Sequence, residues 1–434
     1  MKKVPPSERK RQQLEELICG VAGGIEDGSI LSRFMKLATE KLLQELLERE
    51  QEEFLGRERY SRERKEEEGQ SGIYRNGYET GRLKTAEGVL EVCKPQIRGL
   101  DEAYRSQVWE RLGRTSEQLK DLVIEMYVRG MSTRDVESAL EQALGGFVLS
   151  KSSVSTISEE LLEEYERFRV RDLSGYDVAY LFIDTVYEPL RRYGASSGVM
   201  CCWAYLTDGS KALISLSLAN KESETACLDF LRDLVTRGLT TPLTVTTDGA
   251  AGLIRAVDQL WPKSLRIRCW AHKMRNLEAK VPGPIWQEFK QLLWEVRDAS
   301  SPEQAQAQVD SIVKQYEKQL PEACRCLLDD CEASLQHLRL PRRHRQYVRT
   351  TNLIERTFVE QRRRSKVIPH FWDQKDLIKL VFGTLVRVGY RWEQAQFSQF
   401  EREQIRQLRV LILDRTDAIA EEKVIRRRSA HRVA

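Results

Sequence analysis

Three carboxylates, widely spaced along the chain, have the clearest potential for chemistry. Asp184 lies in YLFIDTVYEPL and Asp248 in LTVTTDGAAG, each at the end of a short apolar run. Glu355 lies in the basic segment RTTNLIERTFVEQRRRSK. Two strands that each end in an acid can place two carboxylates close together, and a helix packed across the same sheet can add a third. Mg²⁺ prefers oxygen ligands and keeps part of its shell open to water and phosphate, so the acids predict a site for phosphoryl transfer.

The elements expected to position these acids form an α/β region. Residues 169–281 predict the order strand, strand, strand, helix, strand, helix, strand, helix. That order matches a ribonuclease-H-like sheet, in which the first strand lies beside the first strand after a helix. Asp184 and Asp248 end those two strands. We predict a ribonuclease-H-like catalytic domain over 169–281, completed by a catalytic helix in 346–371.

The stretch between Asp248 and Glu355 is longer than a plain connection from sheet to helix requires. Residues 282–345 lack the strand pattern and contain amphipathic helical windows punctuated by prolines. They therefore predict an all-α insertion, and residues 372–434 predict a C-terminal helical tail that ends in basic residues.

Two regions are expected before the catalytic domain. Residues 1–71 predict a charged helical region whose apolar stripe packs on a partner or a second chain. Residues 72–168 predict a DNA-binding region, formed by a β-hairpin and three helices that resemble a helix-turn-helix. A plain hairpin and an ordinary three-helix packing unit are the alternatives. The candidate DNA contacts here are Arg75, Asn76, Arg134, Lys151 and Ser153.

Overall charge is nearly balanced in the 434 residues, with 70 Lys and Arg against 66 Asp and Glu, but its distribution is uneven. The segment 339–366 is strongly basic and would attract a polyanion. Arginines three and four positions apart on a helix can contact successive phosphates, although a solvated basic face would give the same pattern. The candidate DNA contacts in this segment are Arg356, Arg362, Arg363, Arg364 and Lys366.

Composition also bounds the compartment in which we expect the chain. The sequence has no run of about 18 apolar residues that would predict a membrane span. Its basic, polar start does not resemble a signal peptide, and its nine cysteines are irregularly placed. These features favour the cytoplasm, where a DNA-binding protein would associate with the nucleoid.

Cys269 and His272 have the spacing of half a zinc site. Cysteines 324, 326 and 331 with His337 could complete it, but their spacing matches no familiar zinc module. We favour a role for His272 beside the acids, in orienting a ligand or contacting DNA, and a purely structural role is the alternative. The same segment and the start of the basic helix add the candidate DNA-proximal residues Lys273, Arg275, Asn276 and Asn352.

With these residues in view, the chain resembles the mutator-type transposases of bacterial insertion sequences, a DDE-type family. The segments that carry the resemblance are IYRNGY, RGMSTRDV with the following SVS, LFIDTVYEPLR, TTDGAAGL, RCWAHKMRN and RTTNLIERTFVEQRRRSKVI. The resemblance implies a ribonuclease-H-like domain with a helical insertion, in which Asp184, Asp248 and Glu355 are the catalytic acids and metal ligands.

The resemblance also implies cleavage and strand transfer of double-stranded DNA. It implies Mg²⁺ as the cofactor, for which Mn²⁺ can substitute, and a homodimer that recognises terminal inverted repeats through its N-terminal regions. We therefore expect a DNA transposase that uses a two-metal mechanism. The alternatives are a structure-selective nuclease with the same sheet and a domesticated DNA-binding regulator.

Overall fold

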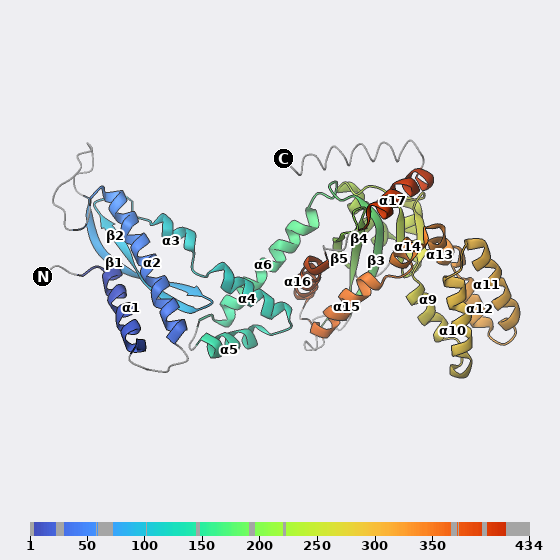
Figure 1. Ribbon diagram of the computed structural model, residues 1–434, viewed down its shortest axis with the longest axis horizontal. Coiled ribbons are helices and arrows are strands. Elements are labelled where there is room, and N and C mark those ends of the chain that lie inside the picture. The colour runs from blue at the N-terminus through green and yellow to red at the C-terminus, as the bar shows by residue number, and fades with distance from the viewer. Residues whose placement is uncertain are drawn as a thin grey trace. The chain divides into compact units, whose positions relative to one another are not determined.

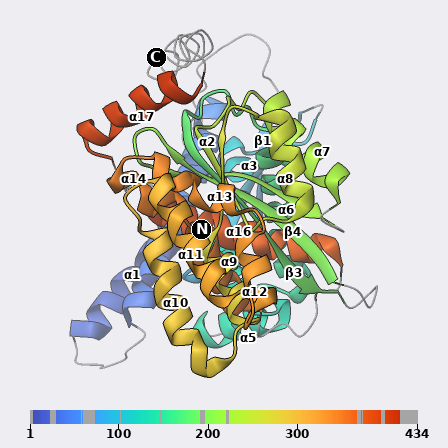
Figure 2. The same cartoon turned by 90° about the vertical axis from the view of Figure 1, so that its right-hand side faces the viewer.

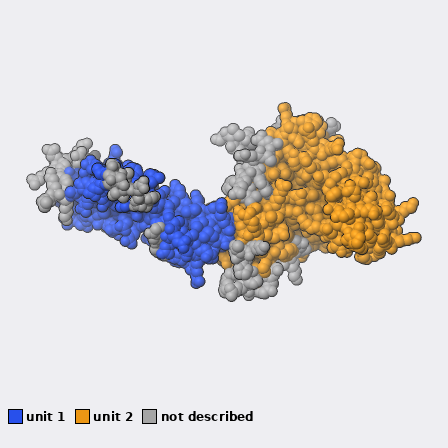
Figure 3. Space-filling view, turned by 60° about the horizontal axis from the view of Figure 1, so that its bottom comes forward, with its two compact units in different colours: residues 1–159 blue, residues 160–434 orange. Residues whose placement is uncertain are grey.

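The computed structural model divides the chain into two units, Met1–Glu159 and Glu160–Ala434 (Figure 3). It describes residues 4–22, 30–57, 59, 73–100, 102–144, 148–190, 196–219, 223–365, 371, 373–392 and 397–413. Lys366 and the basic C-terminal tail lie outside these ranges. In the described ranges no helix is long and apolar enough to cross a membrane.

The first unit contains the expected hairpin and helices (Figure 1). Strands β1 (Tyr74–Thr85) and β2 (Gly88–Arg98) pair in antiparallel fashion, with Thr85 opposite Gly88 at the turn. The helices are α1 (Pro6–Ala22), α2 (Ile30–Leu55), α3 (Gln107–Leu112), α4 (Glu117–Val128), α5 (Thr133–Leu144) and α6 (Lys151–Val170), of which α6 continues past Glu159 into the second unit. The sequence predicted the last three, but it did not predict α3.

Ser132 caps α5, as its spacing from Asp135 predicts. The amide of Asp135 donates to the Ser132 hydroxyl at 3.2 Å, and the amide of Ser132 donates to the Asp135 carboxylate at 3.1 Å. This reciprocal pair satisfies two amides that the helix itself leaves without partners.

Helix α2 packs on β2 through polar side chains. The amide of Gln44 donates to the Cys93 carbonyl at 2.8 Å, and the Cys93 amide donates to the Gln44 side-chain oxygen at 2.7 Å. Glu40 accepts from the amide of Glu91, and Gln51 donates to the carbonyl of Gln96. A two-stranded hairpin leaves backbone groups unpaired along its open edges, and these side chains take the place of a third strand.

The second unit is built on a five-stranded mixed sheet in the order β5-β4-β3-β6-β7. Its strands are β3 (Val178–Pro189), β4 (Ser196–Leu206), β5 (Lys211–Ala219), β6 (Thr244–Thr247) and β7 (Leu265–Arg268). Strands β3, β4 and β5 pair in antiparallel fashion, whereas β6 is parallel to β3 and β7 is parallel to β6. The predicted neighbourhood of β3 and β6 is confirmed, and the topology is compatible with a ribonuclease-H-like fold.

Helices cover both faces of this sheet. On one face, α7 (Glu224–Thr236) and α8 (Ala251–Leu260) share a hydrophobic cluster with Ile183 (Figure 2). On the other, Phe182 packs in the cluster that contains residues of α14 (Arg342–Val348), α15 (Asn352–Ser365), α16 (Gln374–Trp392) and α17 (Gln399–Ile412). Because side chains alternate along a strand, Asp184 lies on the face that α15 covers.

Residues 270–339 are helical and have a hydrophobic cluster of their own. They form α9 (Trp270–Glu278), α10 (Gly283–Arg297), α11 (Pro302–Tyr316), α12 (Pro321–Leu328), α13 (Cys331–Leu335) and the 3-10 helix η1 (Gln336–Arg339). The residues from Gly283 onward are helical, and α9, which shares their hydrophobic cluster, corresponds to the last helix expected within 169–281. The start of an insertion at residue 282 stays a prediction. Trp203 and Trp270 are buried.

Candidate active site

Asp184 and Asp248 lie at adjacent positions on neighbouring strands. The parallel register pairs Ile183 with Thr247, and each acid is the next residue on its strand or just beyond it. Neighbouring strands lie about 4.8 Å apart, so the two acids are side by side at one end of the sheet. Asp184 is buried and its carboxylate accepts the Thr185 amide at 2.9 Å. The Asp248 carboxylate accepts the Ala250 amide at 2.9 Å, in the turn that leads into α8.

Three hydrogen bonds tie the chain before α15 to the strands that end near these acids. The Thr246 hydroxyl donates to the Val348 carbonyl at 2.8 Å, and the Trp270 amide donates to the Arg349 carbonyl at 2.9 Å. The Thr351 amide donates to the sulfur of Cys269 at 3.2 Å. Glu355, in the first turn of α15, is therefore held at the same end of the sheet as the two aspartates.

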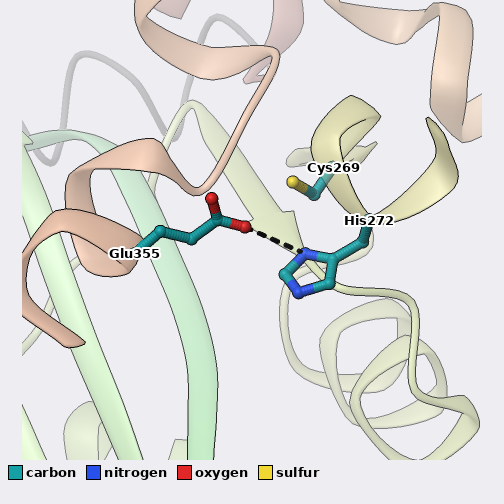
Figure 4. A group of neighbouring side chains, drawn as sticks. All are labelled: Cys269, His272 and Glu355. Atoms are coloured by element: carbon teal, nitrogen blue, oxygen red, sulfur yellow. Dashed lines mark ion pairs between the residues drawn. The ribbon is translucent and has the colours of Figure 1, made fainter. Parts of the chain in front are cut away.

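Glu355 is directed toward two residues of α9. Its carboxylate accepts a hydrogen bond from the Arg275 guanidinium at 2.6 Å. The same carboxylate lies 3.8 Å from Nδ1 of His272 (Figure 4). The carboxylate oxygens of the three acids do not all lie within 4.8 Å of one another. Among the described residues, the group whose ligand atoms approach that closely is Cys269, His272 and Glu355. The two aspartates repel the Glu355 carboxylate and the Arg275 guanidinium attracts it, which accounts for the orientation of Glu355.

His272 lies between the negative charges of this site. Burial lowers its pKa, and the carboxylates of Glu355 and Asp248 oppose that shift without cancelling it. The imidazole is therefore neutral at pH 7, and its buried Nδ1 has no hydrogen-bond partner among the described residues. A neutral nitrogen at this position can accept a hydrogen bond from water or from a substrate.

Cys269 fits a structural role better than a metal-binding one. Burial raises the pKa of its thiol, and the sulfur already accepts the Thr351 amide. A metal ligand would have to be the thiolate, which these surroundings disfavour. His337 is buried with its ring nitrogens 2.9 and 2.8 Å from the carbonyls of Ser334 and Arg297. The oxygen set of Asp184, Asp248 and Glu355 is instead the one that suits Mg²⁺.

The candidate DNA contacts of α15 and α9 differ in exposure. Arg356, Arg362 and Arg363 are exposed, whereas the side chain of Arg364 is 13% exposed and lies 3.9 Å from Glu360. Exposed positions in the same part of the unit are Asn352, Arg275 and Asn276.

Lys273 is 1% exposed and donates to the carbonyl of Asp329. Its neighbours Arg275 and Asn276 lie on the exposed side of the same helix. The sequence of α9 alone did not indicate that Lys273 is buried while Arg275 is exposed. Its placement gives Lys273 a structural contact and does not favour the DNA contact expected from the sequence.

The candidate contacts of the first unit lie on the hairpin and on two helices. Asn76, Arg134 and Lys151 are exposed. Arg75 is half-buried and donates to the Arg57 carbonyl at 2.9 Å, and the hydroxyl of Ser153 lies 2.9 Å from that of Ser150. The structure holds no DNA, so their roles stay predictions.

Sequence reasoning missed Arg268, the last residue of β7. It is 6% exposed, and its Nε has no hydrogen-bond partner among the described residues. The hydroxyls of Thr185 and Thr247, each adjacent in sequence to one of the acids, are also buried without partners there. The alternating segment SLRIRCW contained the only sequence signal, which was a basic residue at the end of a predicted strand.

Comparison with known proteins relates the amino-acid sequence of this chain to transposases. The model of the family described as "Transposase, Mutator family" matches residues 25–395. The transposase for insertion sequence element ISRM5 of Rhizobium meliloti (strain 1021) is 32% identical over 356 residues, which are 82% of this chain and 87% of that protein.

Two further relatives have similar names. The transposase for IS6120 of Mycolicibacterium smegmatis is 32% identical over 62% of this chain and 83% of its own length. The transposase for IS256 in transposon Tn4001 of Staphylococcus aureus is 29% identical over 80% of this chain and 88% of its own length.

Proposed function

Because this chain belongs to the Mutator family of transposases, we propose that it cuts DNA at the ends of an insertion sequence and joins the freed 3′-hydroxyl to target DNA. The observation that carries the proposed site is the parallel pairing of β3 with β6, which puts Asp184 beside Asp248 at the end of the sheet where α15 holds Glu355. The proposed substrate would be met in the nucleoid.

The proposed chemistry is that of a DDE-type enzyme. In cleavage, a water oxygen bonds to phosphorus as the bond to the 3′ oxygen breaks; in joining, the freed 3′-hydroxyl attacks a target phosphate in the same way. Asp184, Asp248 and Glu355 would hold two Mg²⁺ ions, or Mn²⁺ in their place. When bound, these ions activate the attacking oxygen and stabilise the leaving one.

The chain's own residues have defined parts in this proposal. Arg275 holds the Glu355 carboxylate at the end of the sheet, and its exposed guanidinium can move from Glu355 to a phosphate. Neutral His272 offers a hydrogen-bond acceptor next to Glu355. The exposed arginines of α15 would follow the DNA backbone, and the hairpin and α4 to α6 would bind the terminal inverted repeats.

One assay tests the site and separates the alternatives. The purified protein is incubated with Mg²⁺, labelled element-end DNA and a target plasmid, and Asp184→Asn is compared with the wild type. The control is Asp229→Asn, the same change at a 65% exposed position of α7. Joined products that Asp184→Asn alone abolishes would support the proposal. Cleavage without joining would indicate a nuclease, and binding without any product would indicate a regulator.

We further propose that the chain acts as a homodimer that pairs through α2. The face of α2 turned away from β2 exposes Leu31, Met35, Leu42 and Leu46, with exposed fractions of 72%, 48%, 58% and 50%. The buried face of this helix combines Glu40, Gln44 and Gln51 with Leu47 and Leu55, so apolar side chains lie on both faces of α2. An apolar stripe of this kind on a described helix is typical of a surface that another chain covers.

The spacing of this stripe favours a second copy as the occupant. Its members are four, seven and four residues apart, a pattern symmetric about the point between Ala38 and Thr39. Two antiparallel α2 helices related by a two-fold axis would set Leu31 against Leu46 and Met35 against Leu42. The N-terminal half of α2 is rich in Lys and Arg and its C-terminal half in Glu, so the antiparallel pair also brings opposite charges together.

Light scattering of the full chain tests this dimer. Leu42→Lys is expected to halve the measured mass because it places a charge at the centre of the interface. Leu411→Lys is the matched control, at a 79% exposed leucine of α17. A wild-type monomer, or a dimer that survives Leu42→Lys, would contradict the assignment.

A further inference from the structure

Arg268 is a buried cation without an acidic partner among the residues that the structure describes. The residue is 6% exposed, and no described residue makes a hydrogen bond or ion pair with its side chain. Its register partner is Thr247, the residue before Asp248. A buried charge is usually paired, because leaving water costs it free energy that only a counter-charge restores. Since no described residue pairs with the guanidinium, an anionic ligand can serve as its partner.

Arg266, two residues earlier on β7, has acidic partners for its guanidinium. It donates to both carboxylate oxygens of Asp330, at 2.7 and 2.8 Å, and to Asp258 at 3.1 Å. Both arginines point to the face of the sheet that α8 covers, because they are two residues apart on one strand. Among the described residues, the fold thus supplies acids for Arg266 and none for Arg268.

The guanidinium of Arg268 lies against the start of α8. Gly249 has φ +86°, and a Cβ at this position would lie 0.9 Å from Nη1 of Arg268. Any other residue would be strained at this φ, and its Cβ would displace the guanidinium of Arg268. Ala250, the residue just before α8, has no side-chain group that accepts a hydrogen bond from the first amides of the helix. Amides at a helix start carry partial positive charge and attract anions, so two positive features meet here.

The positive charge of Arg268 acts on two residues of α9, one of which, His272, lies beside Glu355. It contributes to the lowering of the pKa of both His272 and Lys273, after the larger effect of burial. The spot is therefore positive, borders Asp248 and contains a cation that nothing in the described chain neutralises.

We propose that Arg268 and the first amides of α8 bind a phosphate group, namely a backbone phosphate of the DNA strand beside the one that reacts. The nature of the ligand rests on the proposed transposase function. Arginine suits this task because its planar guanidinium can donate two parallel hydrogen bonds to phosphate oxygens. Gly249 is required because it leaves the space in which the guanidinium lies.

Inorganic phosphate is the first probe, since it needs no DNA chemistry. We expect phosphate to raise the melting temperature of the full-length wild type in a concentration-dependent way, and to have no such effect on Arg268→Met. In buffer without phosphate or sulfate, Arg268→Met should melt at or above the wild-type temperature, because it removes an unpaired buried charge. Arg255→Met is the control, at a 62% exposed arginine of α8 that pairs with Glu224.

DNA binding without divalent metal is the second probe. Arg268→Met is expected to weaken binding to element-end DNA by about 3-fold to 10-fold and to reduce the slope of log affinity against log salt by about one. Arg268→Lys keeps the charge and the fold but cannot donate from a planar fork, so it should retain part of both effects. Arg255→Met should behave as the wild type.

The outcomes separate this inference from the proposed function. A phosphate effect that Arg268→Met and Arg268→Lys retain in full would overturn the site, even if the wild type joins DNA. A lower melting temperature of Arg268→Met in phosphate-free buffer would also overturn it, since Arg268 would then have a partner within the protein. Loss of the phosphate effect in a protein that joins no DNA would support the site and leave the transposase proposal as the one that fails.

Discussion

Helices α2 and α15 each pack against β-structure, but α2 contacts it with hydrogen-bonding side chains and α15 with apolar ones. Helix α2 turns Glu40, Gln44 and Gln51 toward β2 and exposes leucines. Helix α15 buries Leu353, Ile354 and Phe358 in the cluster on the five-stranded sheet and exposes arginines. The open edge of a hairpin requires hydrogen bonds, whereas the face of a sheet requires apolar surface. The exposed surfaces of the two helices therefore differ. Helix α2 exposes an apolar stripe suited to a second copy of the chain, and α15 exposes a basic face suited to a polyanion.

The largest effect is expected at the acid of α15. Glu355→Gln should lower the rate of DNA joining by at least about 100-fold, because it removes a charge from the proposed metal site. The joining assay with Mg²⁺ measures it, and Glu360→Gln on the same helix is the control. If Glu355→Gln joined DNA at the wild-type rate, α15 would have only a packing role. The functional difference proposed between α15 and α2 would then be wrong.

Acid should affect the two units differently, because all five histidines follow residue 160 in the sequence. Burial lowers the pKa of His337 to about 4, so the unfolded chain binds a proton there first as the pH falls. Stability from this residue is full above pH 6.5 and is lost as the pH falls toward 4. Between pH 7 and pH 5 the loss is about 2 kcal/mol for the second unit. The lowered pKa values of His272 and His344 act in the same direction.

Hydrogen exchange at pH 7 and pH 5, corrected for the intrinsic rates, measures this difference unit by unit. Amides of the five-stranded sheet should lose protection at pH 5, while those of the hairpin should keep it. His337→Asn should reduce the loss in the sheet. An equal loss in the hairpin would show that histidine titration is not its cause.

The polar side of α2 gives the next effect. Gln44→Ala leaves the amide and carbonyl of Cys93 without their partners, so we expect the first unit to lose about 1–3 kcal/mol of stability. Protection of the hairpin amides against hydrogen exchange measures it. Glu45→Ala, at the adjacent exposed position, should have little effect. An unchanged hairpin in Gln44→Ala would mean that α2 does not replace a third strand.

The smallest effect on folding is expected on the apolar side of α2. Leu46→Ala should change the unfolding free energy of the dilute chain by no more than about 0.5 kcal/mol, because the side chain is half exposed. The same change should weaken self-association, which sedimentation at increasing protein concentration measures. A large loss of stability in the dilute chain would place Leu46 in a core and remove the surface proposed for the second copy.

Local patterns in the sequence were sufficient to predict most of the elements, although not α3. The alternation in the hairpin, the cap formed by Ser132 and Asp135, and the apolar runs before Asp184 and Asp248 each appear in the structure as expected. The adjacency of the two aspartates followed from strand order, since parallel strands in register bring their carboxyl ends together. Motif resemblance also indicated the family before the comparisons did.

Contacts between distant segments decided the rest, because burial and pairing depend on what packs opposite a residue. Lys273 and Arg275 are two positions apart in one motif, but one is buried and the other holds Glu355. Arg266 and Arg268 are equally basic in sequence, yet Asp330, remote along the chain, pairs only with Arg266. The sequence by itself determined most of the strands and helices and the adjacency of Asp184 and Asp248. Only the tertiary structure decided which charges are neutralised inside the chain and which are left for a ligand.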